Sequence, residues 1–179
     1  SSSASNYINE ITSFLTKYST FPISIRTLDS IFYRSDKPPA DIEYIFKGLT
    51  EMININSSND QIESLLSCIT SLFSRLSTTE EQILSSFLPF INQIITSPSH
   101  SDLHSAIFDF FGRIVPVAPL TIKSDLSNLI TFASDSFSLT DYQLNISISF
   151  FLRSLSKVLP ISMSPYLPQV VPPLVAILQ

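Results

Sequence analysis

Four arginines recur at a nearly constant interval, and they are the side chains in this sequence with the clearest potential to bind a partner. Each follows a phenylalanine by two positions, and the intervals between them are 41, 38 and 40 residues. A guanidinium pairs with carboxylates and phosphates through several N–H donors, so a row of arginines on successive helices could hold acidic side chains or phosphates. The members of this arginine row are Arg34, Arg75, Arg113 and Arg153.

A structural role is the simpler interpretation of the arginine row. Each arginine falls late in a predicted helix, where the negative end of the helix dipole stabilises a cation and the alkyl stem can cover apolar neighbours. The 15 acidic residues outnumber the ten basic ones. We therefore favour the structural role and keep the row as the candidate contact surface for a partner. Glu63, Asp109 and Asp141 could receive a basic segment, but they do not cluster in the sequence.

The two histidines and the single cysteine do not form a metal or catalytic site in the sequence. His100 and His104 lie four residues apart and could bind zinc from one helix face, but no glutamate stands between them and no third ligand is evident. We expect both at a helix start on a solvated face. Cys68 lies between Leu65 and Ile69 in an apolar stripe, so we expect a buried, unreactive thiol.

The composition excludes several classes of protein. The 179 residues include only two glycines, which argues against hairpin-rich β folds and against nucleotide-binding folds with glycine loops. A formal net charge of −5 does not favour a general binder of nucleic acid or of anionic membranes. No nucleophile elbow and no acid–base pair stands out. We therefore expect no enzymatic activity, no cofactor, no metal and no small-molecule substrate.

The two ends of the sequence carry no targeting or membrane signal. Ser1 to Asn6 are polar and lack the basic and apolar regions of a secretory signal. The uncharged stretch from Val158 to Gln179 has the length to span a bilayer, but it contains five prolines. We therefore expect a soluble protein in a reducing compartment, with no membrane contact.

Apolar residues recur with a helical period along nearly the whole chain. Ile62, Leu65, Leu66 and Ile69, for example, fall at the spacing that places them on one helix face. Three helix starts are marked by capping boxes, Ser58 with Gln61, Thr78 with Glu81 and Thr140 with Gln143. We predict helices over residues 6–18, 22–34, 39–54, 58–76, 79–96, 101–115, 119–136, 140–158 and 164–178, joined by short loops at 35–38, 97–100 and 116–119.

The predicted helices form pairs with a period near 40 residues. The arginine row recurs late in second helices, and the dipeptides Leu88-Pro89 and Leu167-Pro168 recur two periods apart inside first helices. Helix pairs at this period are typical of HEAT repeats, in which stacking of neighbouring pairs builds the core. The predicted fold is therefore all-α, a single HEAT-type α-solenoid of four helix pairs plus one helix. Its units cover residues 6–35, 39–77, 78–117 and 119–160, with a partial unit at 164–179.

The last predicted helix has no partner within the sequence. Its apolar residues, which we expect to lack a partner, are Val170, Val171, Leu174, Val175, Ile177 and Leu178. Natural repeat arrays end in helices with a polar outer face. We therefore expect the chain to be a segment of a longer array.

Two stretches resemble the karyopherin-β superfamily of nuclear transport receptors. The first reads SFFLRSL over 149–155 and PYLPQVVPPL over 165–174, and it is similar to the junction between two repeats, most of all to the late repeats of tRNA exportins. The second reads AIFDFFGRI over 106–114 and is similar to a middle repeat of importin-β. The resemblance covers residues 100–178, and the repeat period extends it to the rest of the chain.

The resemblance implies a non-enzymatic segment of an importin-like or exportin-like receptor. Such a receptor binds cargo, the GTPase Ran and nucleoporins, and it shuttles between nucleus and cytoplasm. The likeness to tRNA exportins also implies tRNA as a partner, but the acidic charge does not support tRNA binding. The alternative function is another protein-binding HEAT scaffold, of the phosphatase or microtubule-array type, because the repeat pattern does not specify the partner.

Overall fold

The computed structural model describes Glu10 and residues 22–34, 42–51, 53–54, 56–74 and 81–177. Every regular element in these ranges is a helix and none is a strand, which confirms the all-α class. None of the helices in these ranges combines the length and hydrophobicity needed to cross a bilayer. Apart from Glu10, which is helical, the predicted helix over 6–18 lies outside the described residues, as do the predicted loop at 35–38, Arg75 and the capping residue Thr78.

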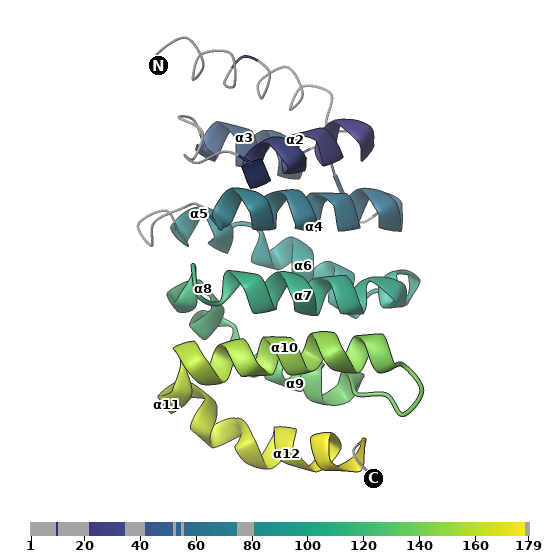
Figure 1. Cartoon of the computed structure of the whole chain (residues 1–179), viewed down its shortest axis with the longest axis vertical. Helices are drawn as coiled ribbons and strands as arrows, with labels where there is room; N and C mark the ends of the chain where they lie inside the picture. The colour runs from purple at the N-terminus through teal and green to yellow at the C-terminus, as the bar shows by residue number, and fades with distance from the viewer. Residues whose placement is uncertain are drawn as a thin grey trace. The chain divides into compact units, whose positions relative to one another are not determined.

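The chain divides into two compact units, Ser1–Gln93 and Ile94–Gln179. The helices of the first unit are α2 (Pro22–Arg34), α3 (Ile42–Glu51), α4 (Asn59–Phe73), α5 (Glu81–Ser85) and the start of α6 (Leu88–Thr96), all labelled in Figure 1. The second unit contains η2 (Pro98–Leu103), α7 (His104–Ile114), α8 (Pro119–Ser124), α9 (Leu126–Ser136), α10 (Tyr142–Val158), α11 (Pro160–Met163), η3 (Ser164–Tyr166) and α12 (Leu167–Ala176).

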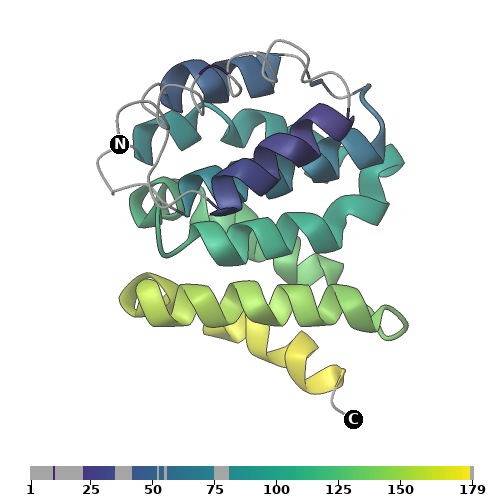
Figure 2. The same ribbon diagram turned by 45° about the horizontal axis from the view of Figure 1, so that its top comes forward.

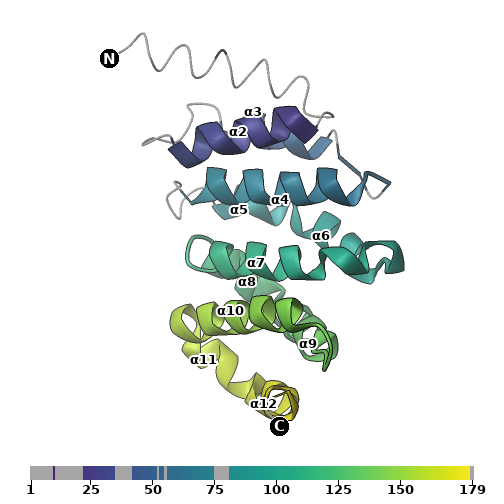
Figure 3. The same ribbon diagram turned by 45° about the vertical axis from the view of Figure 1, so that its right-hand side comes forward.

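In the first unit, α2 and α4 lie side by side and run in the same direction (Figures 1 and 3). The carboxylate of Asp29 on α2 accepts hydrogen bonds from the hydroxyls of Ser67, at 2.7 Å, and Ser71. Arg26 Nε donates to Ser64 Oγ at 3.3 Å. These partners are 38 to 42 residues apart in the sequence. The two helices are therefore joined at the interval that the sequence predicts for neighbouring repeats.

Aromatic rings fill the core of the first unit. Phe46 of α3 meets Phe73 of α4 edge to face, with ring centres 5.5 Å apart, and Phe87 in the same manner at 5.9 Å. All three rings are buried. Such pairs contribute about 0.5–1.5 kcal/mol each beyond the area they bury. The predicted apolar faces of these helices are thus the faces that meet.

The second unit repeats the pattern with α7 and α10, which run side by side in Figure 2. The ring of Phe151 on α10 lies 5.8 Å from the rings of Phe108 and Phe111 on α7. Ser105 and Ser147 join the two helices near their starts through a hydroxyl pair at 2.8 Å. The paired residues are 40 to 43 positions apart, again one repeat interval.

Helices α9 and α12 of the second unit also pack together at this interval. Gln169 Nε2 donates to Thr131 Oγ1 at 3.2 Å, across 38 residues. Val170, which we expected to lack a partner, is the buried residue of α12, so that expectation is wrong for this side chain because α12 packs on α9. Helices α9 and α12 correspond to the first helices of the predicted units 119–160 and 164–179, and they are neighbours. Helices α7 and α10 correspond to the second helices of the predicted units 78–117 and 119–160, and they are neighbours too.

Prolines explain where the structure departs from the predicted helix bounds. The helix over 22–34 is confirmed at both ends, but the predicted helix 79–96 is split into α5 and α6. Pro89 has no N–H to donate to the carbonyl of Ser85, four residues earlier, and Ser85 is where α5 ends. Pro89 and Pro168 each stand second in their helices, not inside them as predicted. The missing N–H costs nothing at that position, since first-turn donors have no intrahelical acceptor.

Three further parts of the chain differ from the predicted bounds. The helix expected over 119–136 breaks at Asp125, whose backbone leaves the helical region (φ −116°, ψ 13°) and separates α8 from α9. The last helical stretch begins at Pro160 rather than at 164, because a proline in the first position suits a helix start. The loop expected at 97–100 is largely the first part of the 3₁₀ helix η2.

The predicted capping boxes have different outcomes. Ser58 caps α4, since its hydroxyl accepts from the Gln61 N–H and the Gln61 side chain accepts from the Ser58 N–H. The box predicted at Thr140 is wrong. Asp141 is the N-cap of α10, and its carboxylate accepts from the Leu144 N–H at 2.9 Å. A carboxylate is also the better cap electrostatically, because it faces the positive end of the helix dipole.

Candidate functional site

The structure places three members of the arginine row at the surface. Arg34 ends α2 in the first unit, while Arg113 on α7 and Arg153 on α10 belong to the second unit. All three side chains are exposed. Arg75 lies outside the described residues. Arg113 and Arg153 belong to the same unit, so their positions can be compared with each other.

Arg113 and Arg153 occupy equivalent positions on two neighbouring parallel helices. The ring of Phe111 lies beside that of Phe151, and each arginine follows its phenylalanine by two positions. Two residues correspond to about 200° of helix rotation, so both arginines point away from the packed rings. Packed helix axes are roughly 8–10 Å apart. The two guanidinium groups therefore share one exposed face of α7 and α10.

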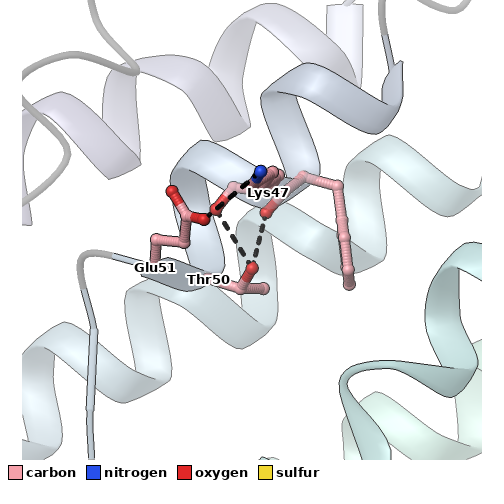
Figure 4. A network of polar contacts seen from close by, with 4 residues as sticks. Lys47, Thr50 and Glu51 are labelled. Atoms are coloured by element: carbon pink, nitrogen blue, oxygen red, sulfur yellow. Dashed lines mark hydrogen bonds and ion pairs between the residues drawn. The ribbon is translucent and has the colours of Figure 1, made fainter.

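Neither of these arginines forms an ion pair with another described residue. The ion pair found among the described residues lies in the first unit, on α3, where Lys47 Nζ is 3.7 Å from Glu51 Oε1. The Thr50 hydroxyl of the same helix donates to the backbone carbonyls of Phe46 and Lys47 (Figure 4). Both members of that pair are exposed, so it contributes well under about 1 kcal/mol. Both guanidinium groups are exposed, and no hydrogen bond or ion pair joins them to the residues that the structure describes.

Of the three described members of the arginine row, two fit the helix-dipole interpretation and the third does not. Arg34 and Arg113 lie in the last turns of α2 and α7. Arg153 stands five residues before the end of α10, and Lys157 occupies the last turn instead. Interaction with its own helix end therefore does not account for the position of Arg153.

A second, exposed apolar stripe runs along α10 beside Arg153. Tyr142, Ile146 and Phe150 are 79%, 44% and 37% exposed. They are spaced by four residues, and the opposite face of α10 carries the buried Ile148, Phe151 and Leu155 that the sequence predicts as core. The stripe was not among the sequence predictions. Its signal is a second run of apolar residues at i, i+4 and i+8 on a helix whose core face is already complete.

Gly112 explains how Phe150 joins this stripe. A Cβ placed on Gly112 would clash with Cδ1 of the Phe150 ring. Glycine costs about 1 kcal/mol relative to alanine in a helix interior. Here it allows the Phe150 ring to lie directly against the backbone of α7.

The acidic candidates do not form a site. Glu63 and Asp141 are exposed, and Asp109 is half-buried on α7. Asp141 is occupied as the N-cap of α10. Glu63 belongs to the first unit, whereas Asp109 and Asp141 belong to the second. A basic partner segment therefore has no concentrated carboxylate surface among them.

The expectation of a solvated histidine pair is wrong. His100 is buried and His104 is half-buried, with its ring edge-on to Phe132 at 4.8 Å. Nε2 of His104 is buried and has no hydrogen-bond partner among the residues that the structure describes. Burial lowers the pKa of His104, opposed by Asp102 and by a hydrogen bond to the Ile95 carbonyl. The described residues contain no cluster of three groups that could hold a metal ion.

The prediction for Cys68 is confirmed. The thiol is fully buried on α4. Burial raises its pKa well above the ordinary value, and the negative charge of Asp29 raises it further. The neutral thiol is a weak nucleophile, so Cys68 serves as a small core residue.

Comparison of the sequence with protein families and with curated proteins finds no relative. No protein-family model matches the chain, and a search of curated proteins returns no significantly similar sequence.

Proposed function

We propose that the chain is a HEAT-type α-solenoid segment that acts by binding other proteins, within a nuclear transport receptor of the karyopherin-β type. The observation that supports it is the packing of helices one repeat apart. Within the first unit α2 packs on α4, and within the second α7 packs on α10 and α9 on α12. Each set is joined by contacts between residues 38 to 43 positions apart.

Stacking at one interval is the principle by which helical repeats build a core and extended surface. Such surfaces bind partners over several repeats and need no catalytic group. The exposed arginines and the apolar stripe are features suited to protein contact, because apolar and guanidinium groups are enriched in interfaces. We therefore propose a non-enzymatic role, without cofactor or metal.

The assignment to nuclear transport rests on the sequence resemblance at 106–114, 149–155 and 165–174. Ran in its GTP-bound form, cargo and nucleoporins are the proposed partners, and nucleus and cytoplasm the proposed locations. A general HEAT scaffold is the alternative, since it has the same helix packing and a different partner.

Binding to Ran tests the assignment. The immobilised chain is incubated with Ran loaded with a non-hydrolysable GTP analogue and, in parallel, with Ran loaded with GDP. We expect retention of the GTP form only. If a chain that is folded by circular dichroism retains neither form, the transport assignment is wrong and the scaffold alternative replaces it.

A further inference from the structure

We propose that the exposed face shared by α7 and α10 is a docking site for an acidic peptide segment that carries large apolar side chains. The site consists of Tyr142, Ile146 and Phe150 with Arg113 and Arg153, all in the second unit. This inference deepens the proposed function, on which it rests, by naming the surface and the chemistry of the partner.

The apolar part of the site is the apolar stripe of α10, which we call the strip because it can anchor the side chains of a partner. Tyr142, Ile146 and Phe150 advance by about 40° of helix rotation at each step and span about 12 Å along α10. Their four-residue spacing places these exposed side chains in one row along the helix, unlike apolar residues scattered singly over a surface. A strip of this length accommodates two or three large side chains of a partner helix or extended segment.

The positive charges at one end of the strip favour a partner that carries negative charge. Arg153 lies 11 residues after Tyr142, so it is rotated only about 20° from it and stands on the same face. Arg113 holds the equivalent position on α7, and Lys157 follows Arg153 one turn later; all three are exposed. No ion pair with a described residue satisfies either arginine. Carboxylates of a partner are the groups that these donors lack.

The charges at the other end of the strip give the partner a direction. Asp141 stands at the start of α10, and Asp102 lies just before α7. These carboxylates repel an acidic residue placed near Tyr142. The acidic residues of the partner should therefore lie beyond Phe150, at the end nearest Arg113 and Arg153.

Nucleic acid fits this surface less well than an acidic peptide does. Affinity for a phosphate backbone comes from several Lys and Arg contacts, whereas this face offers three cations around an apolar strip in a chain of net charge −5. A tRNA probe is accordingly included in the test.

The site can be tested with a phage-displayed library of random 16-residue peptides selected on the whole chain. We expect enriched peptides with net negative charge and at least two large apolar residues. The best peptide, labelled with fluorescein, is then titrated with the chain by fluorescence anisotropy. Absence of enrichment, or enrichment of basic peptides, contradicts the proposal, as does tighter binding of fluorescein-labelled tRNA.

Variants locate the bound peptide. Arg113→Glu with Arg153→Glu should weaken peptide binding at least tenfold, and a peptide with its carboxylates changed to lysine should bind this double variant better than it binds the wild type. Tyr142→Ser with Ile146→Ser should weaken binding without loss of helical circular dichroism, because both residues are exposed. Lys123→Glu on α8 is the matched control, since Lys123 is also exposed and lies in the same unit.

The result is independent of the Ran experiment. Unchanged peptide affinity in the Arg113 and Arg153 double variant overturns the docking site even if the wild type retains GTP-loaded Ran. Peptide binding that depends on both arginines, in a chain that does not retain Ran, supports the site and removes the transport assignment.

Discussion

At the scale of single residues, His104 should make stability depend on pH. Its pKa is lowered in the folded chain because burial disfavours the charged imidazole, so the unfolded chain binds the proton more readily. Stability is therefore full above the ordinary histidine pKa of about 6.5 and falls as the pH decreases below it. Urea unfolding at pH 7.5 and pH 5.5 measures this loss.

The variant His104→Gln separates this residue from other titrating groups. Glutamine keeps a polar side chain without a proton that titrates in this range. We expect the difference in unfolding free energy between the two pH values to become smaller in the variant. An unchanged difference would assign the pH dependence to other groups, such as the carboxylates.

Gly112 and Phe150 should be energetically coupled. In a Phe150→Ala background, Gly112→Ala should stabilise the chain by about 0.5–1 kcal/mol, because alanine is the better helix former and the clash is absent. In the wild type the new Cβ would meet the Phe150 ring, so the gain should shrink or reverse. Urea unfolding of the four chains in this double-mutant cycle gives the coupling energy. A coupling near zero would mean that the ring rotates away freely.

At the scale of the helix, the N-cap of α10 can be tested by comparing substitutions at Asp141 and at Thr140. Asp141→Ala should destabilise the chain by about 1 kcal/mol, because the Leu144 N–H loses its acceptor and the dipole loses a favourable charge. Thr140→Ala is the matched control and should cost less than about 0.5 kcal/mol, as expected for an exposed surface position. Thermal or urea unfolding of both variants checks the ranking. Equal losses would restore Thr140 as a cap.

At the scale of the whole molecule, the exposed side of α12 should promote self-association. Val171 and Val175 are 47% and 46% exposed, while Val170 carries the buried contact of this helix. Replacing both exposed valines by glutamate should reduce association in sedimentation experiments and leave helical circular dichroism unchanged. Ser101→Glu with Ser127→Glu adds the same charge at exposed positions elsewhere in the second unit. If this control reduces association equally, net charge and not the valines is responsible.

The sequence by itself determined the helical class and most of the core. Residues spaced by three and four positions share a face of any helix, so Ile62, Leu65 and Ile69 were predictable as buried. The burial of Cys68 followed from the same stripe, and the Ser58 cap from a pair of side chains three residues apart. These features depend on contacts within one helix or on the average preference of apolar groups for the interior. Such local rules need no knowledge of neighbouring elements.

The tertiary structure alone decided which side chains meet across helices. His104 was expected in solvent, but the ring of Phe132 on α9 covers it. The choice between Thr140 and Asp141 as a cap depended on where the backbone after α9 turned into α10. The face that Tyr142 and Phe150 share with Arg113 exists because α7 and α10 pack in parallel one repeat apart. A sequence pattern gives the direction of a side chain around its own helix, whereas its surroundings depend on segments distant in the chain.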